Sequence, residues 1–372
     1  MKFIHTSIIL IFIFSTVLIV GCDPDTESGG ENENLPFDRR AMLDHWAQNI
    51  IVPNIIVYKN QLVELSDYKD EFIADPSPET YNELIGSWLD AYKAWQQVSM
   101  FDIGKAESIG LRNFTNIYPA DIELIEQHVN SGSYNLALPS NFDAQGFPAL
   151  DYLLFGLSSD QGEIISTLSS ASYSRYLDDL VSRLLSLTQE LQDDWTGGYQ
   201  DEFVDNDGSS ATASVDKVVN DVLFYYEKYL RAGKIGIPAG IFSGSALSSK
   251  VEAPYAGKYS KILLLEGFNA VQDFFNGKSY DNGSTGPSLK QYLEYVQSQN
   301  QTVDIASAII DQWADAHSKI LALDDNLKLQ VEQDNIKMLE AYDALQKVVV
   351  LLKVDMMQAL NIQVDFVDAD GD

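Results

Sequence analysis

Polar residues set in apolar or irregular sequence are the first candidates for chemistry. Arg112 lies in Leu-Arg-Asn-Phe, Asp121 follows Tyr-Pro-Ala, and Asp151 sits in an apolar run. A buried carboxylate must be paired or must bind a cation. Arg112 with Asp121 or Asp151 therefore predicts either a structural ion pair or part of a small polar cleft between helical bundles. The full candidate set is Arg112, Asn113, Asp121, Asp151, Glu252, Tyr255 and Gln272.

Residues for the commonest hydrolytic mechanisms are sparse. His45, His128 and His317 are not spaced as His-x-x-x-His, so the zinc-protease motifs are absent. The chain has one cysteine, Cys22, which excludes an intramolecular disulfide and a metal site built from cysteines. No Gly-x-Ser-x-Gly sequence marks a nucleophilic serine.

The N-terminus predicts export and a lipid anchor. Lys2 precedes an apolar run from Ile8 to Val20, typical of a signal peptide and short for a membrane span. Ile19-Val20-Gly21-Cys22 resembles the bacterial lipobox, which predicts a signal peptide over residues 1–21 and lipidation of Cys22. The alternative is an ordinary signal peptide with an incidental cysteine. The expected location is the bacterial cell envelope, periplasmic or surface-exposed at the outer membrane, with the membrane as a partner through the lipid.

The rest of the chain predicts an all-α fold. Residues 22–36 are acidic and polar and form an expected flexible tether. Apolar residues then recur at helical spacing, as in the stripe from Tyr81 to Val98, with Ser77 as N-cap and Pro78 at the first helical position. Two helical bundles are expected over residues 37–195 and 214–372, joined by an acidic, glycine-containing linker over 196–213. Residues 233–257 hold several glycines and predict an ordered loop rather than a helix.

A short sequence motif occurs once in each of the two predicted bundles. Gly146 to Gly156 reads GFPALDYLLFG, and Gly267 to Gly277 reads GFNAVQDFFNG. The pattern predicts a helix opened by Gly-Phe and closed by Gly in both copies. Duplication explains the repeated motif. The alternative is that two similar helix-packing sequences arose by chance.

Charge and composition exclude some classes of protein. The chain carries a net charge of −31 and is 45% hydrophobic, which is normal for a globular protein and argues against disorder. The acidic excess argues against a nucleic-acid binder, because phosphates would be repelled.

The sequence from Gly146 to Gly156 resembles the imelysin family of bacterial envelope proteins with two helical bundles. Glu252-Ala253-Pro254-Tyr255 and the segment from Leu352 to Met357 support the resemblance. Family members are described as peptidases or iron-regulated proteins, and their Gly-x-His-x-x-Glu motif is thought to bind metal. Here Gly146 matches, Pro148 stands in place of the histidine, and Asp151 in place of the glutamate.

This departure makes the resemblance favour binding over catalysis. A carboxylate without its imidazole partner suits iron or another oxygen-preferring ion better than zinc, so Asp151 is a candidate metal ligand. We expect a non-catalytic protein of iron or metal acquisition, working with a metal ion or envelope transport proteins. The alternatives are a metallopeptidase in which Asp151 positions water on an ion, and a surface interaction protein with a degenerate motif.

Overall fold

Helix α3 (Pro78–Val98) shows how the sequence builds the fold. The Ser77 hydroxyl accepts a hydrogen bond from the backbone N–H of Thr80, and Pro78 occupies the first turn, as predicted. Tyr81, Leu84, Trp88, Tyr92 and Trp95 lie on the buried face of the helix. In this computed structural model, which describes residues 36–280, 282–300 and 304–366, other amphipathic helices bury their stripes in the same way.

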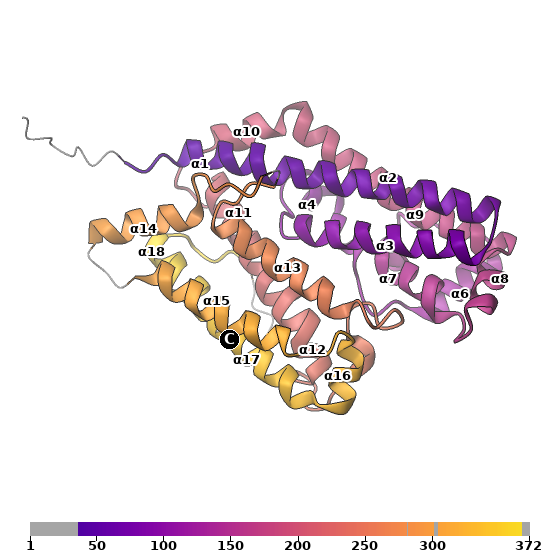
Figure 1. Cartoon of the computed structure of the whole chain (residues 1–372). Coiled ribbons are helices and arrows are strands. Elements are labelled where there is room, and N and C mark those ends of the chain that lie inside the picture. Colours follow the sequence, from indigo (N-terminus) through magenta and orange to yellow (C-terminus); the bar gives the residue numbers. More distant parts are fainter. Residues whose placement is uncertain (1–35, 281, 301–303, 367–372) are drawn as a thin grey trace, which may run out of the picture. The chain divides into compact units, whose positions relative to one another are not determined.

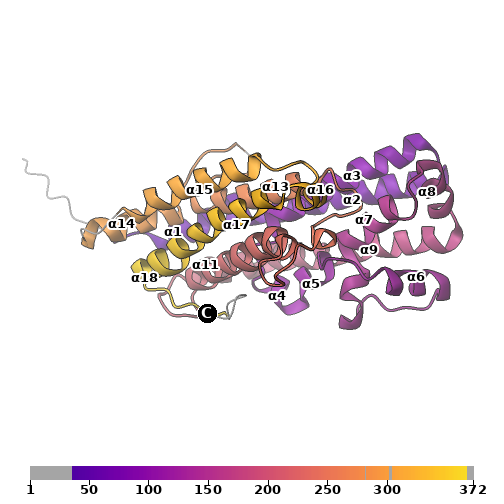
Figure 2. The ribbon, with the colours of Figure 1, turned by 90° about the horizontal axis from the view of Figure 1, so that it is seen from below.

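The first half of the described chain is built around two long helices that pack on a third. Helix α2 (Val52–Ala74) packs against both α3 and α9 (Ala171–Asp194), and α6 and α8 lie against α9 (Figures 1 and 2). A π-helical segment, Ala47–Ile51, joins α1 to α2. The remaining helices of this half are α1 (Arg39–Trp46), α4 (Lys105–Ile109), α5 (Leu111–Thr115), α6 (Ile122–Ser131), α7 (Gly146–Asp151), α8 (Gln161–Leu168) and α10 (Gln200–Asp205).

The second half is also helical. Helix α17 (Asn335–Val350) packs against α15 (Ile305–Leu321) and against the π-helical segment Tyr225–Gly236 (Figure 1). Helix α13 (Ser260–Phe275) packs against α3 and so connects the two halves. The other helices are α11 (Ser214–Phe224), α12 (Ile237–Ala239), α14 (Leu289–Asn300), α16 (Leu327–Gln333) and α18 (Met357–Leu360). Among the described residues the only β pairing is one isolated bridge, Lys278 to Thr285, so the all-α prediction is confirmed.

Two segments predicted to be irregular are partly helical. The first part of the expected linker, 196–213, continues α9 as the π-helical segment Trp195–Tyr199 and then α10. The prediction of a loop from residue 233 is wrong for its start, because helix continues through Gly236 to Ala239. A Cβ on Gly236 would lie 2.7 Å from the ring of Tyr342, so this glycine serves close packing. Residues from Phe37 onward form one compact unit, and the division into two bundles stays a prediction.

The two copies of the repeated motif that begins and ends with glycine differ in the structure. Gly146 begins α7, as predicted, but Gly267 lies inside α13, which already begins at Ser260. The second helix extends back because residues 260–266 are themselves strong helix formers with an apolar face. The expectation that Gly-Phe opens the second helix is therefore wrong.

The expected signal peptide, the lipidated Cys22 and nearly all of the acidic tether lie outside the described residues. Within the described part of the chain, no helix is both long and apolar enough to cross a bilayer.

Candidate functional site

Asp151, the last residue of α7, fastens a distant loop. Its side chain is fully buried, and its two carboxylate oxygens accept hydrogen bonds from the backbone N–H groups of Tyr255 (3.0 Å) and Ala256 (2.8 Å). Burial raises the pKa of Asp151 to about 7; the two backbone hydrogen bonds act in the opposite direction, and the nearby charge of Glu252 adds to the rise. The carboxylate thus ties α7 to a turn more than a hundred residues later.

Gly146 and Pro148 place α7 against its neighbours. Gly146 has a φ of +72°, and a Cβ there would lie 2.1 Å from the carbonyl oxygen of Thr115. Only glycine allows the chain to pass this backbone so closely. Pro148 is buried in the first turn of α7, where a missing N–H costs no helical hydrogen bond. In this chain the motif therefore works as a packing device.

Glu252 belongs to a second buried cluster. It forms an ion pair with Lys234, and its Oε1 accepts hydrogen bonds from Gln96 (3.2 Å) and Asn116 (2.8 Å). Burial lowers the pKa of Lys234, while the charge of Glu252 opposes that shift. The adjoining cavity has a volume of about 10 Å³, no more than the space of one water probe. This cluster is closed to a substrate-sized molecule.

Arg112 pairs with partners that the sequence analysis did not select. Its guanidinium lies 3.4 Å from Asp102 and 3.3 Å from Asp221, and it donates to the carbonyl oxygen of Ser99 at 2.8 Å. Burial raises the pKa of Asp221 to about 7, although the charge of Arg112 opposes the rise. Asp221 shares a helical stripe with Val218 and Tyr225, a signal that could have identified it.

The predicted pairing of Arg112 with Asp121 or Asp151 is wrong. Asp121 and Gln272 lie apart from the clusters described above. Asp121 is exposed and caps α6 by accepting a hydrogen bond from the backbone N–H of Leu124 at 3.0 Å. Gln272 is half-buried in α13, and its side chain makes no hydrogen bond in the part of the chain that the structure describes.

The residues at the motif do not fit a metal ion. Pro148 offers no ligand atom, and both oxygens of Asp151 already accept backbone hydrogen bonds. No group of three or more His, Cys, Asp and Glu residues within the described ranges could hold a metal ion. His128 contacts the Tyr176 hydroxyl at 3.2 Å, and His317 stacks on Phe268. The geometry gives Asp151 a structural role, and its role as a metal ligand stays a prediction without support here.

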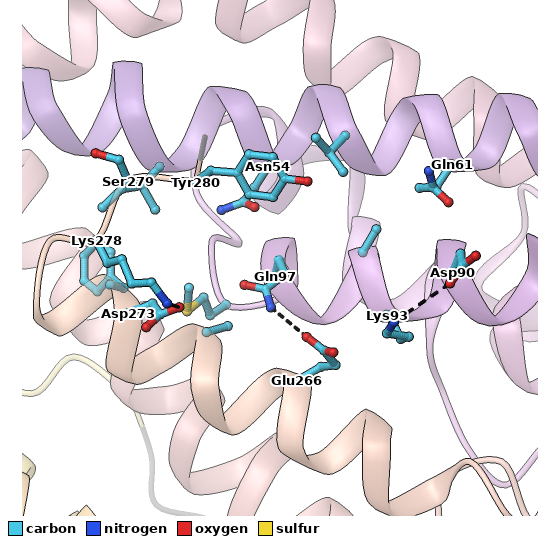
Figure 3. Close-up of a pocket in the computed structure, with 16 residues that line it drawn as sticks. Asn54, Gln61, Asp90, Lys93, Gln97, Glu266, Asp273, Lys278, Ser279 and Tyr280 are labelled. Atoms are coloured by element: carbon cyan, nitrogen blue, oxygen red, sulfur yellow. Dashed lines mark hydrogen bonds and ion pairs between the residues drawn. The ribbon is translucent and has the colours of Figure 1, made fainter. Parts of the chain in front are cut away.

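A larger cavity opens elsewhere, between α2, α3, α13 and the segment after α13 (Figure 3). Its volume is about 460 Å³, within the range of small-molecule sites. Polar side chains dominate the view in Figure 3: Asn54, Gln61, Asp90, Lys93, Gln97, Glu266, Asp273, Lys278, Ser279 and Tyr280. No pattern in the sequence marks this cavity, because each helix alone presents these residues as an ordinary solvated face.

The polar residues of the cavity are only partly paired. Lys278 forms an ion pair with Asp273 at 2.9 Å, and Lys93 lies 3.8 Å from Asp90. Glu266 accepts a hydrogen bond from Gln97 at 3.1 Å but has no basic partner among the described residues. This arrangement can bind a polar ligand, and it lacks a nucleophile held beside a general base.

The chain belongs to the imelysin family, as the fold and the motif region indicate. The sequence model of that family, Peptidase_M75, matches residues 57–352. A protein from Parabacteroides distasonis, described as an iron-regulated protein A precursor, shares the fold with a TM-score of 0.71 and 18% identity, over 86% of this chain and 94% of that one. An imelysin-like protein from Psychrobacter arcticum matches with a TM-score of 0.66 and 17% identity, over 89% and 100% of the chains. No curated protein gives a significant sequence match.

Proposed function

We propose that this imelysin-family protein is a non-catalytic binding protein, lipid-anchored in the bacterial cell envelope, that serves iron acquisition. One observation carries the non-catalytic part. The carboxylate of Asp151 occupies the family's metal-binding position. Both of its oxygens accept hydrogen bonds from the backbone N–H groups of Tyr255 and Ala256. A carboxylate that is fully buried and held in that way positions a loop, and it is not exposed to an ion or a water nucleophile from solvent.

Binding is supported by the contrast between two regions. The clusters around Asp151 and Glu252 are closed, whereas the cavity beside Glu266 is open and polar. A binding protein needs an accessible cavity with convergent polar groups, and it does not need activated side chains.

The anchor and the link to iron have separate support. The lipobox-like sequence ending at Cys22 supports lipidation. The Parabacteroides structure carries the words iron-regulated in its description, which suggests the physiological setting. At 18% identity that likeness shows the fold, so the role in iron acquisition is part of the proposal.

Two measurements test the proposal together. Purified protein should leave unfolded casein intact with added Zn²⁺, Fe²⁺ or a chelator, and a strain lacking the protein should grow more slowly than its parent only under iron limitation. Complementation with wild type should restore growth, whereas a Cys22→Ser form should restore it poorly. Metal-dependent cleavage of casein, or a growth defect that ignores iron supply, would overturn the proposal.

A further inference from the structure

The cavity beside Glu266 carries an excess of acceptor groups. Three carboxylates and two lysines line it, and each lysine is already assigned to Asp90 or Asp273. Glu266 is half-buried and, among the residues that the structure describes, accepts a hydrogen bond only from Gln97. An unpaired carboxylate at the wall of a partly enclosed cavity attracts a cation, and the net charge of −31 strengthens that attraction.

Asn54 supplies a second, independent observation. Its side chain is only 5% exposed, and no hydrogen bond from its amide exists within the described residues; Oδ1 is a fully enclosed acceptor without a partner. A buried amide without partners costs free energy, so such a group in a cavity wall points to a ligand. Figure 3 shows Asn54 projecting from α2 toward the cavity, beside the ring of Tyr280.

The lining between these groups is apolar. Helices α2, α3 and α13 and the residues next to α2 and α3 contribute aliphatic and aromatic side chains to the same cavity, namely Ile50, Val57, Ala94, Met100, Ala270 and Phe274. Such a surface contacts a methylene chain favourably, while Tyr280, which is about half exposed, offers an aromatic face to a cation.

We propose that this cavity binds a small aliphatic diamine. One ammonium group contacts the Glu266 carboxylate, and the methylene chain lies on the apolar lining. The second ammonium lies beside the Tyr280 ring, and rotation of the Asn54 side-chain amide turns its enclosed Oδ1 toward it. This assignment rests on the binding part of the proposed function and is independent of the link to iron.

Calorimetry with three four-carbon probes tests the ligand class. Diaminobutane should bind with a dissociation constant that rises with added salt, because the interaction is charge-based. Butanediol, which is neutral, should bind at least tenfold more weakly, and succinate, which is anionic, should not bind.

Variants locate the site. Glu266→Gln should weaken diaminobutane binding at least tenfold, and Asn54→Leu should weaken it about as much. Glu123→Gln removes the same charge from an exposed position on α6 and should leave the affinity unchanged. Circular dichroism of each variant confirms folding.

The outcomes separate this inference from the proposed function. Equal binding of butanediol, preferential binding of succinate, no binding of diaminobutane, or an unaffected Glu266→Gln variant would each overturn the diamine site. Those results would leave the casein and iron-limitation experiments intact as the test of the binding role.

Discussion

Glu252 and Lys234 form an ion pair in which both side chains are almost completely enclosed, at 1% and 3% exposure. The two residues are eighteen positions apart, and their pair sits where α3, the 225–236 segment and the Glu252 loop meet. Gln96 and Asn116 satisfy the remaining acceptor capacity of the carboxylate. Charges enclosed in this way are held by each other and not by water, so each depends strongly on its partner.

Removal of one partner should therefore cost more than removal of both. Lys234→Met leaves the Glu252 carboxylate buried and unpaired, and should lower the free energy of unfolding by about 3–5 kcal/mol. The double variant Lys234→Met/Glu252→Gln should recover part of that loss. Urea unfolding of the wild type, both single variants and the double variant measures the coupling. Additive losses would contradict a tightly coupled pair.

Asp151 should make stability depend on pH. Its pKa is raised by burial to about 7 from an ordinary value of 3.8, so the folded state binds the proton more tightly than the unfolded state. The free energy of unfolding should fall as pH rises between about 4 and 7. The fall should be about 1.4 kcal/mol for each unit by which the pKa of Asp151 differs between the folded and the unfolded state. Asp151→Asn should remove the contribution of Asp151 to this change of the free energy of unfolding with pH.

Asp221 provides the control for the pH experiment. Its pKa is also raised to about 7, so Asp151→Asn should leave a residual slope that Asp221→Asn reduces further. Asp151→Asn also replaces one acceptor oxygen by an amide donor facing a backbone N–H, which costs about 1–3 kcal/mol at any pH. An unchanged slope in the Asp151 variant would refute the assignment.

Gly146→Ala should be severely destabilising. The new Cβ would lie 2.1 Å from the Thr115 carbonyl oxygen, and φ is +72°. Overpacking against backbone and the left-handed strain together should cost more than about 3 kcal/mol. Gly86→Ala is the matched control, because Gly86 lies within α3 with no atom near its Cβ position, and should gain about 0.5–1 kcal/mol. Thermal unfolding distinguishes the two, and equal melting temperatures would contradict the packing argument.

Asn54→Leu should stabilise the protein while it impairs binding. The variant replaces a buried, unpartnered amide by an apolar side chain of similar size, which should gain about 1–3 kcal/mol. Gln61→Leu, in the same cavity and more accessible, should change stability by less than about 0.5 kcal/mol. Denaturant unfolding without ligand gives both values, and a destabilised Asn54→Leu protein would show that the amide has a structural partner.

Cys22→Ser should release the protein from the membrane. Without the thiol no lipid can be attached, and stable anchoring requires acyl chains. Fractionation of cells grown with a radiolabelled fatty acid should show label and protein in the membrane fraction for the wild type only. Equal membrane association of both forms would contradict the lipid anchor.

The sequence by itself determined the fold class and the local geometry. Helical stripes, the cap at Ser77 and the glycine that begins α7 all depend on residues a few positions apart, and these were confirmed. It also indicated that Glu252 and Asp151 are buried, because each lies within apolar sequence. The family resemblance added the expectation of a binding role at the Asp151 position.

Only the tertiary structure decided which charged groups meet. Arg112 pairs with Asp221, which is 109 residues away, and Asp151 accepts hydrogen bonds from a loop 104 residues away. The cavity beside Glu266 likewise draws its lining from α2, α3 and α13. Helical periodicity specifies which face of each helix is buried, but partners come from the packing of helices far apart in the chain. Gly236 shows the same limit, because a tight contact with Tyr342 inside a helix, and not a loop, requires it.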